Sequence, residues 1–494
     1  MPDIEQNPLY NENISGDIKT VCENLKNLCG QSDLLVKEFK IGGVNIALVV
    51  CDGMTDNLYI TQSINTVLDS FKDDRFKNSG ECIGAVNSRA LLSSQTESIN
   101  TFAELLTRIY SGFCVLLFEG ASQALVFNAV GYKTRGISVP TADVNVNGAK
   151  EGFIESAQIN MTMIRRRIKS PALRFETLSL GKESKTSCCL IYLNNIVSPK
   201  LLQSVREKLE RKELDIILSD GSARLLLAEK PFSLFSEVGS TDRPDTVCSK
   251  IYEGKVAVLI DGSPFALIVP FTFAEHFINL DDYSYKALYV NLLRIIKYSA
   301  FFIAVLLPGF YVAVCTFHPE IVPPTLLFTI TSSEVALPFS LVTEALMILF
   351  IYEILRESGL RLPKEIGHAV SIVGALVIGD ATVRAGIIGA PMVLVAALSV
   401  ISAFIVPQFM DSVVLLRFGF ILLGGFMGLF GIALGVAFVI LNICAKDNFG
   451  LPFSSAISPV SRGSFLNIFF KGRRQGYGSA DIPKVQELPG SDIE

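Results

Sequence analysis

The chain has 494 residues, of which 50% are hydrophobic and only 18% are charged, and its mean hydropathy is +0.44. Residues 418–445 contain no charged side chain and exceed the ~20 residues that a membrane-spanning helix needs, which excludes a wholly soluble protein. The net charge of −5 gives no general attraction to nucleic acid.

The first thirty residues are acidic and polar, without a basic stretch followed by an apolar one. They predict no cleavable signal peptide, and we expect residues 1–32 to form a frayed leader with one short helix. Ten cysteines occur without a C-x-x-C pair, mostly in the first half of the chain. This usage favours reduced thiols in a cytosolic domain over disulfides.

Residues 33–140 are predicted to form a first αβ cytosolic lobe. The short apolar runs VNIALVVCDG and FCVLLFEG indicate strands, and the segments ITQSINTVLDSFK and INTFAELLTRIY indicate helices. The alternation predicts a mixed sheet. A polar stretch rich in Gly and Asn, SVPTADVNVNGAKEG, then predicts a boundary between lobes.

Residues 150–285 are predicted to form a second αβ cytosolic lobe. Its expected order is a helix (AQINMTMIRRRI), a strand (SCCLIYLNNI) and a second helix that begins with Ser198 as N-cap and Pro199 in the first turn. The later segment KVAVLIDGSPFALIVP predicts a hairpin that turns at Asp261 and Gly262, because Asp-Gly between apolar runs is a strong hairpin signal.

Residues 290–445 are predicted to form a transmembrane helical bundle, with helices at 298–317, 335–355, 366–388, 390–410 and 418–444. Arg294 and Lys297 precede the first span, whereas the loop HPEIVPP after it lacks Lys and Arg, so the N-terminal domain is expected in the cytoplasm. Residues 446–494 are expected to form a basic cytosolic tail that is partly disordered.

Five simple spans would place that tail outside, so one predicted segment must depart from a simple span. Either the Gly-rich stretch 366–388 is re-entrant, or the run PTLLFTI beside Pro323 and Pro324 adds a half-span. Non-helical backbone at that depth must be buried in protein or line a wet cavity.

Four ionisable residues lie inside apolar segments: Glu344, Glu353, Asp380 and Arg384. Such residues are costly in lipid and usually face a bundle interior, a partner or a water-filled path. Asp380 and Arg384 are spaced to pair on one helix face, which is consistent either with holding helices together or with gating an ion path. Glu353 is also consistent with a position at the cytoplasmic interface.

Four glycines recur at Gly424, Gly428, Gly431 and Gly435. Small residues in such a row allow another backbone to come close, so they predict helix packing or, alternatively, a pore-lining helix that bends.

No catalytic residue, metal site or cofactor is predicted. The three histidines are scattered, and no Gly-x-Ser-x-Gly elbow occurs. The basic cluster Arg165, Arg166 and Arg167 is consistent with a solvated helix face or with an intersubunit or lipid-headgroup contact.

Several long strings resemble the A subunit of GerA-type nutrient germinant receptors from bacterial spores. They include EGFIES, MIRRRIKSPALRFETLSLGKESKT, TDRPDTV, YEGKVAVLIDGSPFALIVP, TFHPEIVPPTLL and LRESGLRLPKEIGHAVSIVGALVIGDATVRAGI. The family-motif residues among them are Arg165, Arg166, Arg167, Asp242, Arg243, Pro244, Asp245, Asp261 and Gly262.

The resemblance implies a non-enzymatic subunit of a complex in the spore inner membrane, with a transporter-like B subunit and a C lipoprotein as partners and membrane lipid around it. It implies an oligomeric, ligand-gated ion channel whose N-terminal domain and tail are cytoplasmic. The expected fold is a two-lobed α+β soluble N-terminal domain followed by an α-helical polytopic membrane domain. Alternatives are a secondary transporter, whose embedded carboxylates bind protons or substrate, and a non-conducting scaffold of the related spore-stage-V AF type.

Overall fold

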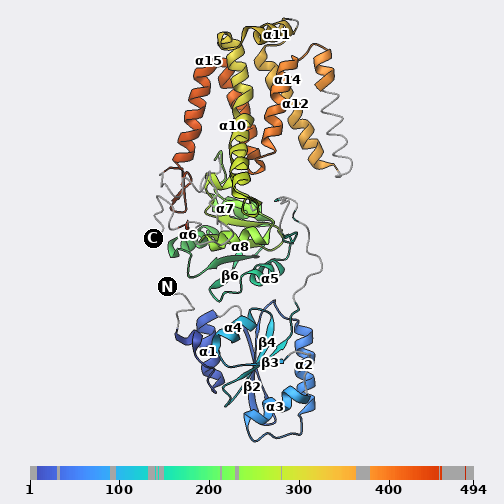
Figure 1. The fold of residues 1–494 in the computed structure, drawn as a ribbon, viewed down its shortest axis with the longest axis vertical. Coiled ribbons are helices and arrows are strands. Elements are labelled where there is room, and N and C mark those ends of the chain that lie inside the picture. The colour runs from blue at the N-terminus through green and yellow to red at the C-terminus, as the bar shows by residue number, and fades with distance from the viewer. Residues whose placement is uncertain are drawn as a thin grey trace.

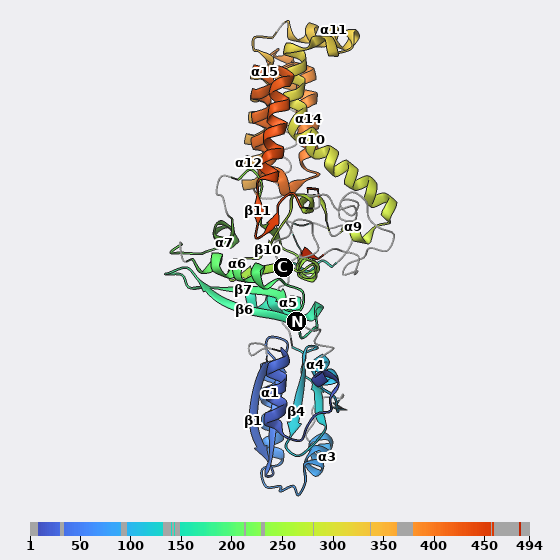
Figure 2. The same cartoon turned by 90° about the vertical axis from the view of Figure 1, so that its left-hand side faces the viewer.

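The computed structural model describes most of the chain in three parts that follow one another along its longest axis: lobe 1, lobe 2 and a helical bundle (Figures 1 and 2). The predicted fold class, a two-lobed α+β region followed by an all-helical region with apolar helices, is confirmed. The residues described are 8–29, 34–89, 96–131, 140, 143, 149–211, 214–228, 233–279, 281–335, 337–362, 379–455, 457–458 and 484–485.

Lobe 1 is a five-stranded sheet in the order β1-β2-β4-β5-β3, covered by helices on both faces. Its elements are η2 (Pro8–Asn11), α1 (Ile18–Cys29), β1 (Leu34–Ile41), β2 (Val44–Cys51), α2 (Asn57–Ser70), α3 (Ser79–Arg89), β3 (Thr96–Ile99), α4 (Phe102–Ile109), β4 (Phe113–Phe118) and β5 (Ala124–Asn128). Helices α1 and α4 cover one face, and α2 and α3 cover the other.

The predicted mixed sheet of lobe 1 is wrong, because every strand pair in it is antiparallel. Gly42 and Gly43 join β1 to β2 with φ of 55° and 92°, values that suit a two-residue hairpin turn. Such a short connection only joins antiparallel strands. The sequence prediction found two of the five strands and therefore could not assign their directions.

The predicted separate leader is also wrong from Ile14 onward. Val21, Leu25 and Leu28 of α1 are buried in the same core as strands β2 and β4. Their spacing places them on one helix face, which packs against the sheet. This segment is therefore part of lobe 1.

Lobe 2 repeats the element order of lobe 1, with a five-stranded antiparallel sheet in the order β6-β7-β9-β10-β8. Helices α5 and α8 cover one face of the sheet, and α6 and α7 cover the other. Its elements are α5 (Ala157–Arg167), β6 (Leu173–Leu180), β7 (Thr186–Leu193), α6 (Pro199–Glu210), α7 (Asp220–Leu227), β8 (Gly239–Thr241), α8 (Pro244–Tyr252), β9 (Val256–Ile260) and β10 (Ala266–Val269).

The local predictions for lobe 2 hold with two refinements. Ser198 is the N-cap of α6 and Pro199 its first residue, but the Ser198 side chain makes no capping hydrogen bond. The hairpin β9-β10 forms, with a connection over residues 261–265 that is longer than a two-residue turn. Gly262 has φ of 89° there, a left-handed conformation that favours glycine.

After lobe 2 the chain passes through η3 (Phe273–Phe277) and α9 (Asp281–Ser284) into the bundle. The bundle elements are α10 (Ala287–Phe317), η4 (Pro319–Ile321), α11 (Pro324–Glu334), α12 (Leu341–Arg361), α14 (Ala390–Ala403), η5 (Pro407–Phe409) and α15 (Met410–Cys444), followed by β11 (Asp447–Asn448) and β12 (Leu451–Pro452). Within the described residues, the stretches Ala287–Phe317 and Pro407–Cys444 are long and apolar enough to cross a membrane.

The predicted helix 298–317 lies inside α10, which begins eleven residues earlier. The predicted helix 335–355 corresponds to α12, which both begins and ends six residues later. The run PTLLFTI is part of α11, which lies across the far end of the bundle (Figure 2). Of the predicted segment 366–388, residues 366–378 lie outside the described residues, and residues 379–384 are helical.

The predicted single helix 418–444 is wrong, because α15 reverses direction at Gly428. That residue has φ of 61° and ψ of −146°, a non-helical conformation open essentially only to glycine. A methyl group added to Gly435 would lie 2.6 Å from Cε1 of Phe420. In a straight helix two residues so far apart in sequence would be separated by about 22 Å. The residues on either side of Gly428 therefore form two antiparallel helices.

Because α15 is a helical hairpin, Met410 and Cys444 lie at the same end of the bundle, next to lobe 2. Phe409 and Phe453, which flank the hairpin, both contact Phe273. The α15 hairpin therefore returns the chain to this end of the bundle. Because both arms lie in one apolar stretch, a count of hydrophobic segments predicts a single span there.

Candidate functional site

Lobe 2 and the bundle meet in a buried contact region that we call the junction. It contains a cluster of aromatic rings from lobe 2, η3, α10, η5 and the chain after α15: Phe235, Phe273, His276, Phe277, Phe301, Phe409 and Phe453. Phe409 lies at its centre, with ring centroids 5.3 Å from Phe273, 4.9 Å from Phe277 and 5.0 Å from Phe301. The start of the α15 hairpin is therefore packed on lobe 2.

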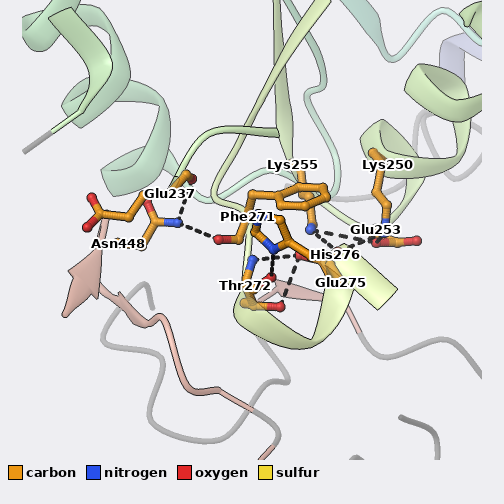
Figure 3. A network of polar contacts seen from close by, with 9 residues as sticks. All are labelled: Glu237, Lys250, Glu253, Lys255, Phe271, Thr272, Glu275, His276 and Asn448. Atoms are coloured by element: carbon orange, nitrogen blue, oxygen red, sulfur yellow. Dashed lines mark hydrogen bonds and ion pairs between the residues drawn. The ribbon is translucent and has the colours of Figure 1, made fainter. Parts of the chain in front are cut away.

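Glu275 of η3 organises the charged side of the junction (Figure 3). Its Oε1 accepts hydrogen bonds from Lys250, at 2.7 Å, and from Lys255. Its Oε2 accepts from the backbone N–H of Thr272 at 2.9 Å, which completes a capping box at the start of η3. Lys255 is only 2% exposed. Buried charges are stable in protein only when paired and hydrogen-bonded, as these are.

The electrostatics of this network favour an ionised carboxylate. Burial by itself raises the pKa of Glu275, but the ammonium groups of Lys250 and Lys255 together lower it further, so its pKa lies well below the usual range. Burial lowers the pKa of Lys255 in spite of the attraction of Glu275. The two lysines therefore favour the ionised form of Glu275.

His276 connects the charged network to the aromatic cluster. Its ring stacks on Phe409 with centroids 4.7 Å apart, and its Nδ1 lies 3.0 Å from the carbonyl oxygen of Thr272. Burial lowers the pKa of His276 to about 4, with Glu275 and Lys255 as the charged neighbours. The imidazole is therefore neutral at pH 7.

This shift predicts a pH dependence of stability. An unfolded histidine has a pKa near 6.5, so below that pH the unfolded chain binds a proton that the folded chain does not accept until about pH 4. Between pH 6.5 and pH 4.5 this group should reduce the free energy of unfolding by about 2–3 kcal/mol. Thermal unfolding of the wild type and of His276→Asn between pH 6.5 and pH 4.5 measures this loss of stability. Equal pH slopes in the two proteins would contradict the assignment.

The chain that leaves the bundle is bonded back to lobe 2. Asn448 donates from Nδ2 to the carbonyl oxygens of Glu237 and Phe271, both at 2.9 Å. Lys446 donates to the carbonyl oxygen of Phe235 at 2.8 Å, and Ser412 near the start of α15 donates to that of Leu234. Both ends of the α15 hairpin are thus held by lobe 2.

The first helix of the bundle is also anchored at the junction. Asp282 is 1% exposed and accepts from Lys297 at 3.0 Å, with Nε of Arg294 at 3.5 Å from its other oxygen. Arg294 and Lys297, which the sequence assigned as flanking charges of a span, therefore belong to an ion-pair cluster in which Arg294 is buried and Lys297 is half-buried.

The four predicted intramembrane charges are placed in three separate environments. Glu344 is buried at the start of α12, where its Oε2 accepts from the N–H of Gly389 at 3.0 Å. Glu353 pairs with Arg356 at 2.8 Å. Asp380 and Arg384 pair with each other at 2.8 Å, and both are largely exposed. Among the described contacts, no other bond joins members of this set.

Arg417 is a buried charge in the bundle that the sequence analysis missed. It is 1% exposed, donates from Nε to the carbonyl oxygen of Ala304 at 3.0 Å, and has Nη1 3.8 Å from Glu353. Ser399 donates to the same carbonyl at 2.8 Å. Arg417 thus links α10, α12 and α15. It directly precedes the uncharged run, so it was excluded from the predicted span.

The predicted glycines lie at close helix contacts. A methyl group on Gly424 would clash with the carbonyl oxygen of Gly309 in α10, and one on Gly431 with that of Leu423 in the other arm of the hairpin. Gly428 forms the reversal. These positions are consistent with the packing interpretation.

The family-motif residues of TDRPD hold the segment that enters lobe 2. Arg243 donates to Asp245 at 2.6 Å and to the carbonyl oxygen of Ala149 at 3.0 Å, and Pro244 is the first residue of α8. The carbonyl oxygen of Asp242 accepts from the N–H of Phe153 at 2.8 Å.

Asp261 and Gly262 act on the same segment. An Asp261 carboxylate oxygen accepts from the N–H of Ala157 at 3.0 Å, and the N–H of Gly262 donates to Glu155 at 2.7 Å.

The basic cluster of α5 is not a solvated face. Arg165 is 3% exposed and lies between the rings of Tyr110 in lobe 1, at 4.6 Å, and Phe175 in lobe 2, at 4.7 Å. Arg166 and Arg167 both pair with Glu151. Arg165 therefore contacts both lobes, whereas Arg166 and Arg167 hold the segment that enters lobe 2.

Taken together, these features define a membrane-associated protein in which a two-lobed α+β region is bonded to a bundle of apolar helices. The profile of the family described as Bacillus/Clostridium GerA spore germination protein matches residues 19–476, so the chain belongs to that family. The resemblance drawn from the sequence motifs is thereby confirmed.

Two proteins of similar sequence support the family assignment. The chain is 34% identical over 458 residues to spore germination protein KA of Bacillus subtilis (strain 168), covering 92% of this chain and 84% of that protein. It is 33% identical over 462 residues to the uncharacterized membrane protein YfkQ of the same strain, covering 93% and 89%. It is also similar to the crystal structure of the N-terminal domain of the A subunit of the Bacillus megaterium spore germinant receptor GerK3, with 25% identity, a TM-score of 0.41 and coverage of 53% and 98%.

Proposed function

We propose that this chain is the A subunit of a spore germinant receptor that acts with a transporter-like B subunit and a C lipoprotein in the spore inner membrane. The family match over residues 19–476 and the similarity to spore germination proteins support this role. In the proposal the lobes and the tail are cytoplasmic, the bundle crosses the membrane several times, and the subunit forms a homo-oligomer.

The junction supports a role in signal transmission. Lobe 2 holds both ends of the α15 hairpin through Leu234, Phe235 and Glu237. Asp282 of α9, on the chain that leaves lobe 2, holds α10 through Lys297. A shift of lobe 2 therefore moves both helices together. Nutrient binding to the receptor acts by favouring one of two arrangements, which requires a different affinity for each.

The embedded charges support an ion path through the bundle. Glu344 is buried in the first turn of α12. Arg417 of α15 lies 3.8 Å from Glu353, further along α12. Ionisable groups in membrane bundles usually mark ion or proton pathways. In the proposal, germinant binding rearranges the bundle and releases cations along this path.

Substitution of the buried Glu344 and of the exposed Asp380, the carboxylates predicted for the ion path, tests the proposal. Glu344→Ala or Asp380→Ala should slow germinant-triggered ion release from spores by about tenfold or more, the effect of ~1.4 kcal/mol on the opening equilibrium, while the receptor still assembles. Glu357→Ala is the matched control for Glu344→Ala, because Glu357 lies on the same helix but is exposed and, among the described residues, pairs with Arg361. Normal release with normal receptor levels in both variants would contradict the gating role.

A further inference from the structure

An apolar cavity lies where α10, the two arms of the α15 hairpin and the chain after β12 meet. Its volume is about 340 Å³, and no polar surface faces it. Phe302 and Leu306 line it from α10, Phe420 from the first arm and Val439 from the second. Phe273 of the junction closes its inner end, so the cavity lies at the end of the bundle nearest lobe 2.

The surroundings of the cavity indicate what fills it. Phe302 and Ile440 line it and are each 55% exposed, so the cavity wall continues into the outer apolar surface of α10 and α15. Only 22% of the most apolar window of α15 is buried within the chain, and its mean hydropathy is 2.4. Such a surface favours a hydrocarbon environment, because contact between so large an apolar area and water is unfavourable.

We propose that this cavity binds one acyl chain of a membrane phospholipid, taken from the leaflet that faces the lobes. Tyr298, Ser454 and Ser458 are among the lining residues, but no polar atom is exposed to the cavity. The cavity surface is therefore apolar, and each methylene group transferred into it is stabilised. The bound chain packs on Phe273 and on Phe301, which also contact Phe409. The lipid is thereby part of the contact between lobe 2 and the bundle.

Neighbouring positions on α15 provide a matched test. Val439 lines the cavity, whereas the adjacent Phe438 is 61% exposed and is absent from its wall. The natural chain contains no tryptophan, so Val439→Trp and Phe438→Trp introduce the same new side chain inside and outside the cavity. Val439→Ala enlarges the cavity without filling it.

The full-length protein is reconstituted in phosphatidylglycerol and phosphatidylethanolamine vesicles with a trace of phosphatidylcholine that carries a photoactivatable diazirine at the end of one acyl chain. Adducts are then mapped by mass spectrometry. We expect adducts on α10 around Phe302 and on α15 around Val439 in wild type. Val439→Trp should reduce them about tenfold, the equivalent of excluding a few methylene groups, whereas Phe438→Trp and Val439→Ala should retain them.

Two outcomes would overturn the proposal. One is equal labelling at these positions in Val439→Trp and Phe438→Trp. The other is cross-linking of this wall to α10 or α15 of a second copy in place of lipid. If Val439→Trp fails to fold, the adducts on the wild-type protein still test the proposal, because their absence from both helix segments would contradict lipid binding.

Discussion

Glu275→Gln is expected to lower the free energy of unfolding of lobe 2 and its junction by about 3–5 kcal/mol, the usual cost of removing one partner from a buried ion pair. Glutamine keeps the size of the side chain but loses the charge that neutralises Lys250 and Lys255. Lys255 would remain buried without its closest anion. Thermal and denaturant unfolding of the full-length protein in detergent measures the loss, and the level of receptor in spore membranes should fall with it.

Two controls make this prediction specific. Glu320→Gln removes a carboxylate that is 69% exposed and should change stability by less than ~1 kcal/mol. Lys255→Met combined with Glu275→Gln should cost less than the sum of the single changes, because the two residues interact directly. A change below ~1 kcal/mol for Glu275→Gln alone would show that the network does not stabilise the junction.

Gly309→Ala is expected to destabilise the bundle by about 3 kcal/mol, at the upper end of the cost of overpacking. The added methyl group would lie 2.5 Å from the carbonyl oxygen of Phe420, so α10 and α15 must move apart. Gly419→Ala on α15 is the matched control, since a methyl group there meets nothing within 4 Å. It should be neutral or stabilising by up to about 1 kcal/mol, because alanine favours helix.

The comparison of these two variants by thermal unfolding in detergent tests the close packing of α10 on the α15 hairpin. If Gly309→Ala were as stable as Gly419→Ala, the two helices would not approach as described. Because Gly309→Ala destabilises the bundle, spores that carry this variant should lose the germinant response. Spores that carry Gly419→Ala should respond normally.

The sequence predicted lobe 2 well because its strands and helices are marked locally. The strand around Cys188, the start of α6 at Ser198 and the hairpin after Val256 each carry a composition signal within a few residues. The helix α1 was misread as a leader, although the spacing of Val21, Leu25 and Leu28 defines an apolar face. Charged residues between them concealed that pattern.

The reversal of α15 could not be read from hydropathy. Polar residues mark turns in soluble proteins, whereas Gly428 lies between apolar residues on both sides. A membrane environment requires no polar turn where neighbouring helices surround the backbone. The non-helical backbone of Gly428 and the contacts of Gly431 and Gly435 with the preceding arm reveal that the chain turns back.

The junction was missed for a different reason. Lys250, Lys255 and Glu275 come from separate elements, so each appears in the sequence as an ordinary surface charge. Their burial depends on β9, η3 and the bundle coming together in the fold. By contrast, Glu344 was found because an isolated charge in an apolar run is conspicuous, and its partner, the N–H of Gly389, is a backbone group.

We propose that this chain carries ions through its bundle under control of the lobes, and electrical recording from the purified full-length protein in planar bilayers tests this proposal most directly. The account predicts cation-selective currents that Glu344→Gln reduces about tenfold or more and that Glu357→Gln leaves unchanged. Folded, membrane-inserted protein that passes no current in the presence of its receptor partners and germinant would contradict the claim and favour a non-conducting scaffold.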